Sequence, residues 1–180
     1  MGEENWFCVQ GYKGDATRKI GIVGTVSIPR SSILQRIQTE FGQTEKIHDG
    51  QSDEIRVVAI MNAFNEEEVM RVLDMAQERG WVPDASFEAR GRHVLYLTGQ
   101  PRESGMLAAT ALGLTVACVG HKTAEEWGIR FMAAALRTVF PNIPVEEVYE
   151  EEIPVIRPPK QKSILPVQAL EVQEVDNVRE

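Results

Sequence analysis

The stretch ACVGHKTAEEWGIRFMAAALRTVF, residues 117–140, decides the fold class of this chain. It begins with a short apolar run, passes through a Gly-His pair, and continues with apolar residues at helical spacing. A buried strand that leads directly into a helix is the repeating unit of an α/β sheet. His121 and Glu125 stand four residues apart where the predicted strand hands over to the predicted helix. A metal site and helix-start chemistry both account for that spacing.

The same unit recurs along the chain. Nearly continuous apolar runs, typical of strands buried on both faces, occupy residues 55–61, 93–99 and 114–120. A further strand is predicted over 18–28, and helices over 29–41, from Asn65 to Gly80, over 102–113 and over 124–139. We therefore predict an α/β fold with a mostly parallel sheet, helices on its faces and βαβ units. Residues 42–54 are predicted to form a loop and residues 145–149 an edge strand.

The composition excludes several classes of protein. The chain has 180 residues and a net charge of −8, and no Lys/Arg run supplies a nucleic-acid patch. No apolar run is long enough for a transmembrane helix, and the acidic N-terminus lacks the features of a secretory signal, so we expect no membrane partner. Cys8 and Cys118 form no metal or redox motif, and we expect Cys118 to be buried. These features predict a reducing, cytoplasmic location.

Two regions are predicted. Residues 1–150 carry all the strand and helix patterns and should form an α/β domain. Residues 151–180 contain four prolines, many charges and no steady period, which indicates a flexible tail.

His121 and Glu125 have a structural and a functional interpretation. In the structural one, Thr123 and Glu126 form a capping box at the helix start, and the residues alone favour this. In the functional one, His121 and Glu125 lie at the carboxyl end of a buried strand, where α/β sheets bind ligands. A neutral imidazole and a carboxylate suit Zn, Mn or Fe.

Other polar positions are weaker candidates. The turn TGQPRESG, residues 98–105, precedes a helix and could bind an anion with the help of Arg102. Such a turn is more often a simple helix start. His48 lies in a polar segment and His93 at a strand start, and both are expected to be solvated or structural.

The segment from Gly120, with His121 and Glu125, resembles the closing motif of the Nif-three-like family, the Ngg-one-interacting factor three relatives, also labelled GTP cyclohydrolase I type 2 homologues. The earlier YLTG is similar to the strand and loop before that motif. GYKGDATRKIGIVGTV is similar to the family's Gly-rich crossover, with Gly14, Arg18, Ile20 and Gly21 as loose counterparts. The resemblance covers residues 8–150 and corresponds to the second half of the family fold.

The resemblance implies a dinuclear metal centre between two α/β halves, oligomeric rings and partners related to transcription. His121 and Glu125 match the ligands of the second half. The His-His pair and Asp of the first half have no counterpart here, since the three histidines are scattered. The chain is then a shortened homologue without catalysis, a fragment, or a protein whose site another subunit completes.

Two functions follow. The first is a metal-dependent, hydrolase-like protein in which a divalent ion activates water. The second is a non-catalytic module that binds another protein. In both cases we expect a homo-oligomer, or a tail that folds back, because a missing half would uncover apolar surface.

Overall fold

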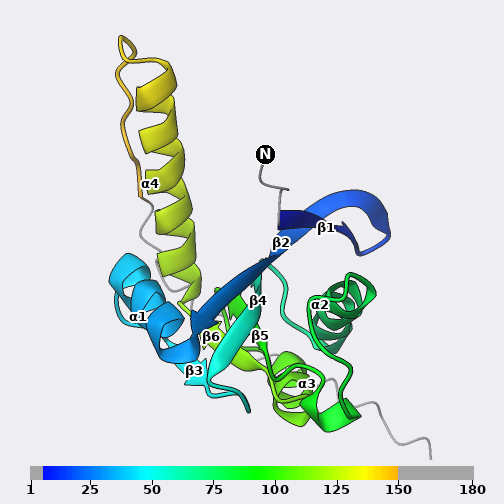
Figure 1. Ribbon diagram of the computed structural model, residues 1–180. Coiled ribbons are helices and arrows are strands. Elements are labelled where there is room, and N and C mark those ends of the chain that lie inside the picture. Colours follow the sequence, from blue (N-terminus) through cyan, green and yellow to red (C-terminus); the bar gives the residue numbers. More distant parts are fainter. Residues whose placement is uncertain (1–5, 150–180) are drawn as a thin grey trace, which may run out of the picture. The chain divides into compact units, whose positions relative to one another are not determined.

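The computed structural model describes residues 6–149 (Figure 1). The predicted tail, residues 151–180, lies outside the described residues. The elements in chain order are β1 (Trp6–Tyr12), β2 (Asp15–Pro29), α1 (Arg30–Phe41), β3 (Lys46–His48), β4 (Glu54–Met61), α2 (Glu66–Glu78), the 3-10 turn η1 (Phe87–Ala89), β5 (Val94–Thr98), α3 (Glu103–Ala111), β6 (Thr115–Cys118) and α4 (His121–Val139).

The six strands form one mixed sheet in the order β1-β2-β4-β5-β6-β3. β4 pairs in parallel with β5, and β5 with β6, while α2 and α3 are the two crossovers. The predicted α/β class and its βαβ units are therefore confirmed. The parallel part is confined to these three strands. β1 and β2 join through a two-residue turn, which makes an antiparallel hairpin, and β2–β4 and β3–β6 are antiparallel as well.

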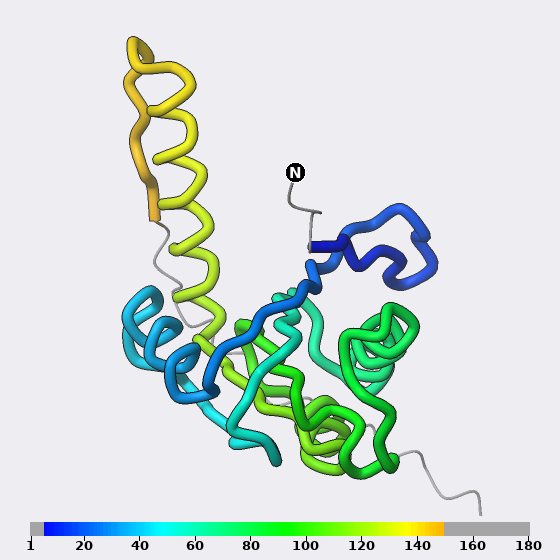
Figure 2. Tube along the Cα trace, viewed as in Figure 1, coloured from blue at the N-terminus to red at the C-terminus, as the bar shows by residue number. Residues whose placement is uncertain are grey.

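Helices cover both faces of the sheet (Figures 1 and 2). One core cluster joins alternate residues of the strands, such as Val57, Ala59 and Tyr96, to the apolar stripe of α2 and to α3. The other cluster joins Val58 and Leu95 to α1 and to the first turn of α4. This two-sided burial explains why the central strands lack the apolar-polar alternation of half-exposed strands.

Several predicted helix ends are confirmed. Asn65 caps α2 with its Oδ1, which accepts a hydrogen bond from the Glu68 backbone N at 3.0 Å. Gly42, with φ of 79°, follows α1, and Gly80, with φ of 67°, follows α2. Both backbone conformations are costly for other residues.

The predicted start of α4 is wrong. The helix begins at His121 and its cap is Gly120, because the Ala124 backbone N already donates to the Gly120 carbonyl at 3.0 Å. Thr123 therefore lies within the first turn, and no side chain caps the helix. The capping box expected of Thr123 and Glu126 does not form, and α4 is the extended helix at the upper left of Figure 1. No helix within residues 6–149 combines the length and apolar character needed to cross a bilayer.

Two other predictions are wrong. Residues 145–149 form no strand; they contact the end of α4, where Arg137 pairs with Glu147 at 2.7 Å and donates to the Val145 carbonyl at 2.9 Å. Their apolar-acidic alternation matches a strand, yet no strand within residues 6–149 pairs with them. The loop predicted over 42–54 contains β3, which is defined by its pairing with β6 rather than by a local pattern.

Gly105 allows α3 to pack closely against Phe64 in the loop between β4 and α2. A Cβ at Gly105 would lie 2.8 Å from the buried ring of Phe64. Gly105→Ala should therefore lower the free energy of unfolding by about 1–3 kcal/mol, measured by urea denaturation. Gly128→Ala is the matched control, since a Cβ there meets nothing within 4 Å on α4. That change should raise stability by about 0.4–1 kcal/mol. Equal losses in both variants would contradict this account of α3.

The two cysteines should differ in reactivity. Cys118 is fully buried in β6, and burial, with a smaller contribution from Glu45, raises the pKa of its thiol to about 11. Cys8 is exposed on β1. A thiol reagent at pH 8 should modify Cys8 in the native protein and reach Cys118 only after unfolding, as read by mass spectrometry. Rapid native modification of Cys118 would show that β6 is not protected.

The raised pKa also predicts a pH dependence of stability. Folding favours the neutral thiol, so this contribution is present below pH 9.0 and is lost as the pH rises toward about 11. Stability should therefore fall more steeply over this window in the wild type than in Cys118→Ala. Parallel pH profiles for the two proteins would contradict the prediction.

Candidate functional site

His121 and Glu125 are brought together as the sequence predicts. Both lie in the first turns of α4, and the His121 Nε2 is 3.1 Å from the Glu125 Oε1. Residues four apart on a helix share one face, so the helix itself sets this distance. The side chains are 52% and 61% exposed, so both retain accessible donor atoms. The pair is therefore available to a ligand or to another chain.

Two glycines place this pair at the edge of the sheet. Gly120 has φ of 96°, a left-handed conformation that turns the chain from β6 into α4. Gly99 follows β5, and a Cβ there would lie 3.6 Å from the Ala124 Cβ and from the His121 Cα. The first turn of α4 thus packs closely against the carboxyl end of β5. This is the edge of a parallel sheet where ligands bind.

A cavity of about 360 Å³ lies at the same edge. Its lining comes from the turn after β1, the loops after β4 and β5, the start of α3 and His121. Its polar lining residues are Tyr12, Lys13, Asn62, Asn65, Thr98, Gln100, Arg102, Ser104 and His121. A larger hollow of about 710 Å³ is lined by α1 alone, so it is a surface along one helix. The cavity beside His121 is therefore the candidate site.

The predicted metal ligands fit part of a coordination sphere. An imidazole nitrogen and a carboxylate oxygen at this separation are suitable donors for Zn, Mn or Fe. Within residues 6–149, however, no three residues among His, Cys, Asp and Glu are grouped to hold an ion. Catalytic zinc sites use three protein ligands. The described residues therefore offer two donors, fewer than the three protein ligands of a catalytic zinc site.

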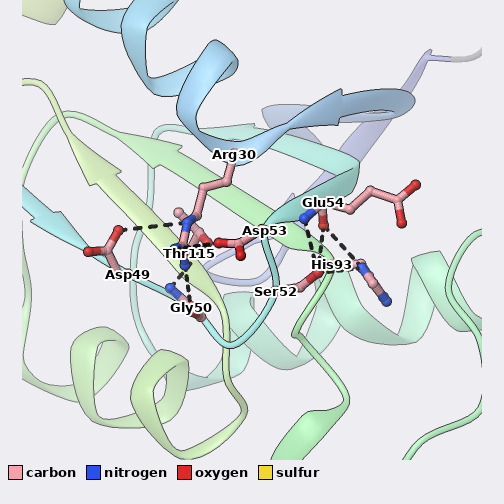
Figure 3. A network of polar contacts seen from close by, with 8 residues as sticks. All are labelled: Arg30, Asp49, Gly50, Ser52, Asp53, Glu54, His93 and Thr115. Carbon is pink, nitrogen blue, oxygen red and sulfur yellow. Dashed lines mark hydrogen bonds and ion pairs between the residues drawn. The ribbon is translucent and has the colours of Figure 1, made fainter.

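The other two histidines lie away from this cavity. His48 is in β3, at the edge of the sheet. His93 precedes β5 and is 9% exposed, and Figure 3 shows it beside Ser52 and Glu54. Its Nδ1 is 3.1 Å from the Ser52 hydroxyl and 3.0 Å from the Glu54 carbonyl. The structural role predicted for His93 is in agreement with these contacts.

Ser52 and His93 do not form a nucleophilic pair. The Ser52 Oγ is also within hydrogen-bonding distance of the Glu54 backbone N and carbonyl, both at 3.1 Å, which keeps it in a local turn. In the neighbouring part of the network, the Arg30 guanidinium donates to the Gly50 carbonyl and to the Asp53 carboxylate (Figure 3). The network lies at the amino end of β4, and it orders the segment between β3 and β4.

A buried ion pair positions the hairpin that lines the cavity. Glu68 is 1% exposed, and its Oε2 lies 3.5 Å from the Arg71 Nε. Burial raises the pKa of Glu68, and Arg71 opposes that shift. Arg71 also donates to the carbonyls of Gln10 and Gly11 at the end of β1. This arginine therefore attaches the β1–β2 hairpin to α2 and fixes the turn that carries Lys13.

The sequence predicts part of the lining. Arg102, the anion ligand that it suggests, lines the cavity with His121. No local pattern marks Lys13, Asn62 or Thr98 as site residues. Lys13 reaches the site only through hairpin pairing and Arg71, which no local pattern reveals. The position of Thr98 at the end of a buried strand was the one available signal.

No protein-family model and no curated protein matches the chain. Three solved structures illustrate what it is similar to. Staphylococcus aureus protein SA1388 is 18% identical with a TM-score of 0.49, over 74% of this chain and 40% of that one. TTHA1606 from Thermus thermophilus is 17% identical with a TM-score of 0.48, over 83% and 52%. A Bacillus cereus protein related to NIF3 is 16% identical with a TM-score of 0.42, over 67% and 31%.

The chain thus spans about half or less of each of these structures. The Bacillus cereus protein is described as related to NIF3, the family that the segment around His121 resembles in sequence.

Proposed function

We propose that this chain is a Nif-three-like protein that supplies part of a divalent metal site, with His121 and Glu125 as its ligands. The observation that carries the proposal is the pair itself: an imidazole and a carboxylate, 3.1 Å apart and accessible, beside a cavity at the carboxyl edge of the sheet. A metal at such a site lowers the pKa of water and supports hydrolysis. The role of this chain is to present the two donors and to shape the cavity.

The remaining ligands come from a second copy of the chain in this proposal. A single chain offers two donors among its described residues, which is too few for firm binding. Two copies together hold two imidazoles and two carboxylates from His121 and Glu125, the donor number of a four-coordinate site. The high exposure of both side chains leaves them free to meet their equivalents.

The outer surface of α4 supports such an assembly. Ala133 is the one residue within α4 that is buried, whereas Phe131, Met132 and Leu136 are exposed. Trp127 and Phe131 stack with their ring centroids 5.3 Å apart. An apolar helix surface of this kind is typical of an interface. Because the same helix begins with His121, contact between copies along α4 would also bring their donor pairs into one assembly.

A second candidate is a non-catalytic module that binds through α4 and holds no metal. The same exposed side chains favour it, as does the incomplete donor set. The two candidates share the interface and differ in the role of His121 and Glu125. Metal content therefore separates them.

Purified protein should contain Zn, Mn or Fe in its oligomer and lose it on dissociation. Native mass spectrometry and elemental analysis of one sample give the assembly state and the metal content. His121→Ala and Glu125→Gln should each lower the metal content by at least about tenfold, because removing one ligand from so small a set leaves too few donors.

His48→Ala is the matched control, since its position in β3 lies outside the cavity. That variant should retain the metal content of the wild type. A metal-free oligomer after purification with added metal would contradict the proposal and favour the interaction module. Metal retained in both His121→Ala and Glu125→Gln would place the site elsewhere.

A further inference from the structure

The cavity beside His121 has a charge opposite to that of the whole protein. The chain has a net charge of −8, yet Lys13 and Arg102 line the cavity and no Asp or Glu does. Arg102 is exposed, and its guanidinium donates to the Gln100 Oε1 at 3.3 Å, with both residues in the cavity lining. Two cations without a carboxylate in the lining create a local positive potential. That potential is suited to an anionic ligand.

Thr98 adds a hydroxyl to the lining of this space. The residue is 5% exposed and lines the cavity, and its hydroxyl is not among the fully buried, unpaired side-chain atoms of residues 6–149. Side chains alternate along a strand, so Thr98 points to the same face as Tyr96, whose hydroxyl donates to the Ala63 carbonyl beside the cavity. A hydroxyl in the wall of a cavity is one of the polar groups that orient a bound ligand.

Two helix starts offer further donors. α3 begins after Arg102 and α4 after Gly120, and neither has a side-chain cap. Their first backbone N–H groups therefore lack a side-chain acceptor, and Ser104 and His121 in these turns line the cavity. The positive ends of helix dipoles favour anions at such points. Glu125, whose Oε1 is 3.1 Å from the His121 Nε2, is not among the residues that line the cavity.

The turn that carries Lys13 is conformationally costly. Lys13 has φ of 50°, and within residues 6–149 it is the one residue other than glycine with a positive φ. Two-residue hairpin turns favour Asn or Gly at this position. A lysine in this conformation is less stable than either of these residues. The turn places the Lys13 side chain in the cavity lining, which gives a physical reason for a lysine at this position.

We propose that the cavity binds the phosphate group of a small phosphorylated molecule. Lys13 and Arg102 neutralise the phosphate charge, and Thr98 donates a hydrogen bond to one of its oxygens. A volume of about 360 Å³ leaves room for the organic part of the ligand. This site goes beyond the proposed metal function and does not require a metal ion. Binding is therefore tested in chelator-treated protein.

Inorganic phosphate is the probe, titrated into the full chain at low salt and followed by NMR chemical shifts or calorimetry. Arg102→Gln should weaken binding by about tenfold or more, because it removes a charge-assisted hydrogen bond. Thr98→Val, which keeps the shape of the buried side chain, should weaken it by about threefold. Lys13→Gly should weaken binding and leave the fold intact, since glycine tolerates the turn.

Lys122→Gln is the matched control, because it removes a cation near the cavity that is not part of its lining. It should leave phosphate affinity within about twofold of the wild type, given its screening by solvent. No phosphate binding by the wild type would overturn the proposal. Equal weakening in Lys122→Gln and Arg102→Gln would overturn it as well, since it would show diffuse attraction to a surface.

The two proposals fail separately in these experiments. Loss of the metal site shows in the elemental analysis of the oligomer, whereas phosphate binding is measured without metal. A parallel titration with acetate distinguishes a phosphate site from a carboxylate site. Tighter binding of acetate than of phosphate would contradict the assignment of the ligand class.

Discussion

The burial of β5 on both faces is the constraint on which this structure depends. All five residues of β5 are buried, and its neighbours β4 and β6 pair with it in parallel. A strand in that position has no exposed face for polar side chains, so polar chemistry is confined to its ends. The parallel arrangement then brings the carboxyl ends of β4, β5 and β6 to one edge. Thr98, Asn62 and His121 meet there because of topology and not because of their spacing in sequence.

The turn of the β1–β2 hairpin lines the cavity at this edge, and the ion pair that positions the hairpin requires the desolvation of a carboxyl group. Glu68 is buried with a raised pKa, so its ionised form is disfavoured by desolvation. Buried ion pairs contribute little net stability, because attraction is offset by desolvation. Arg71 nevertheless binds two backbone carbonyls of β1. The function that we assign to this pair is therefore geometric, since it fixes the turn that presents Lys13.

The sequence predicts best what local patterns determine. β4, β5 and β6 follow from apolar runs, α2 follows from Asn65 and its apolar stripe, and the His121–Glu125 contact follows from helix geometry. β3 and the cavity could not be predicted, because both depend on pairing between distant segments. The capping box failed for a different reason. Thr123 and Glu126 match the pattern, but Gly120 had already started the helix one turn earlier.

The metal and phosphate proposals are linked through electrostatics. A divalent cation held by His121, as we propose, would share its cavity with Lys13 and Arg102, and like charges disfavour one another in a partly enclosed space. A bound phosphate would neutralise these side chains and could itself donate oxygen to the ion. Linkage is reciprocal, so a phosphate that strengthens metal binding must bind more tightly when the metal is present. Under both proposals, the phosphate would add oxygen donors to those that His121 and Glu125 of two copies provide, and metal binding would then depend on phosphate concentration.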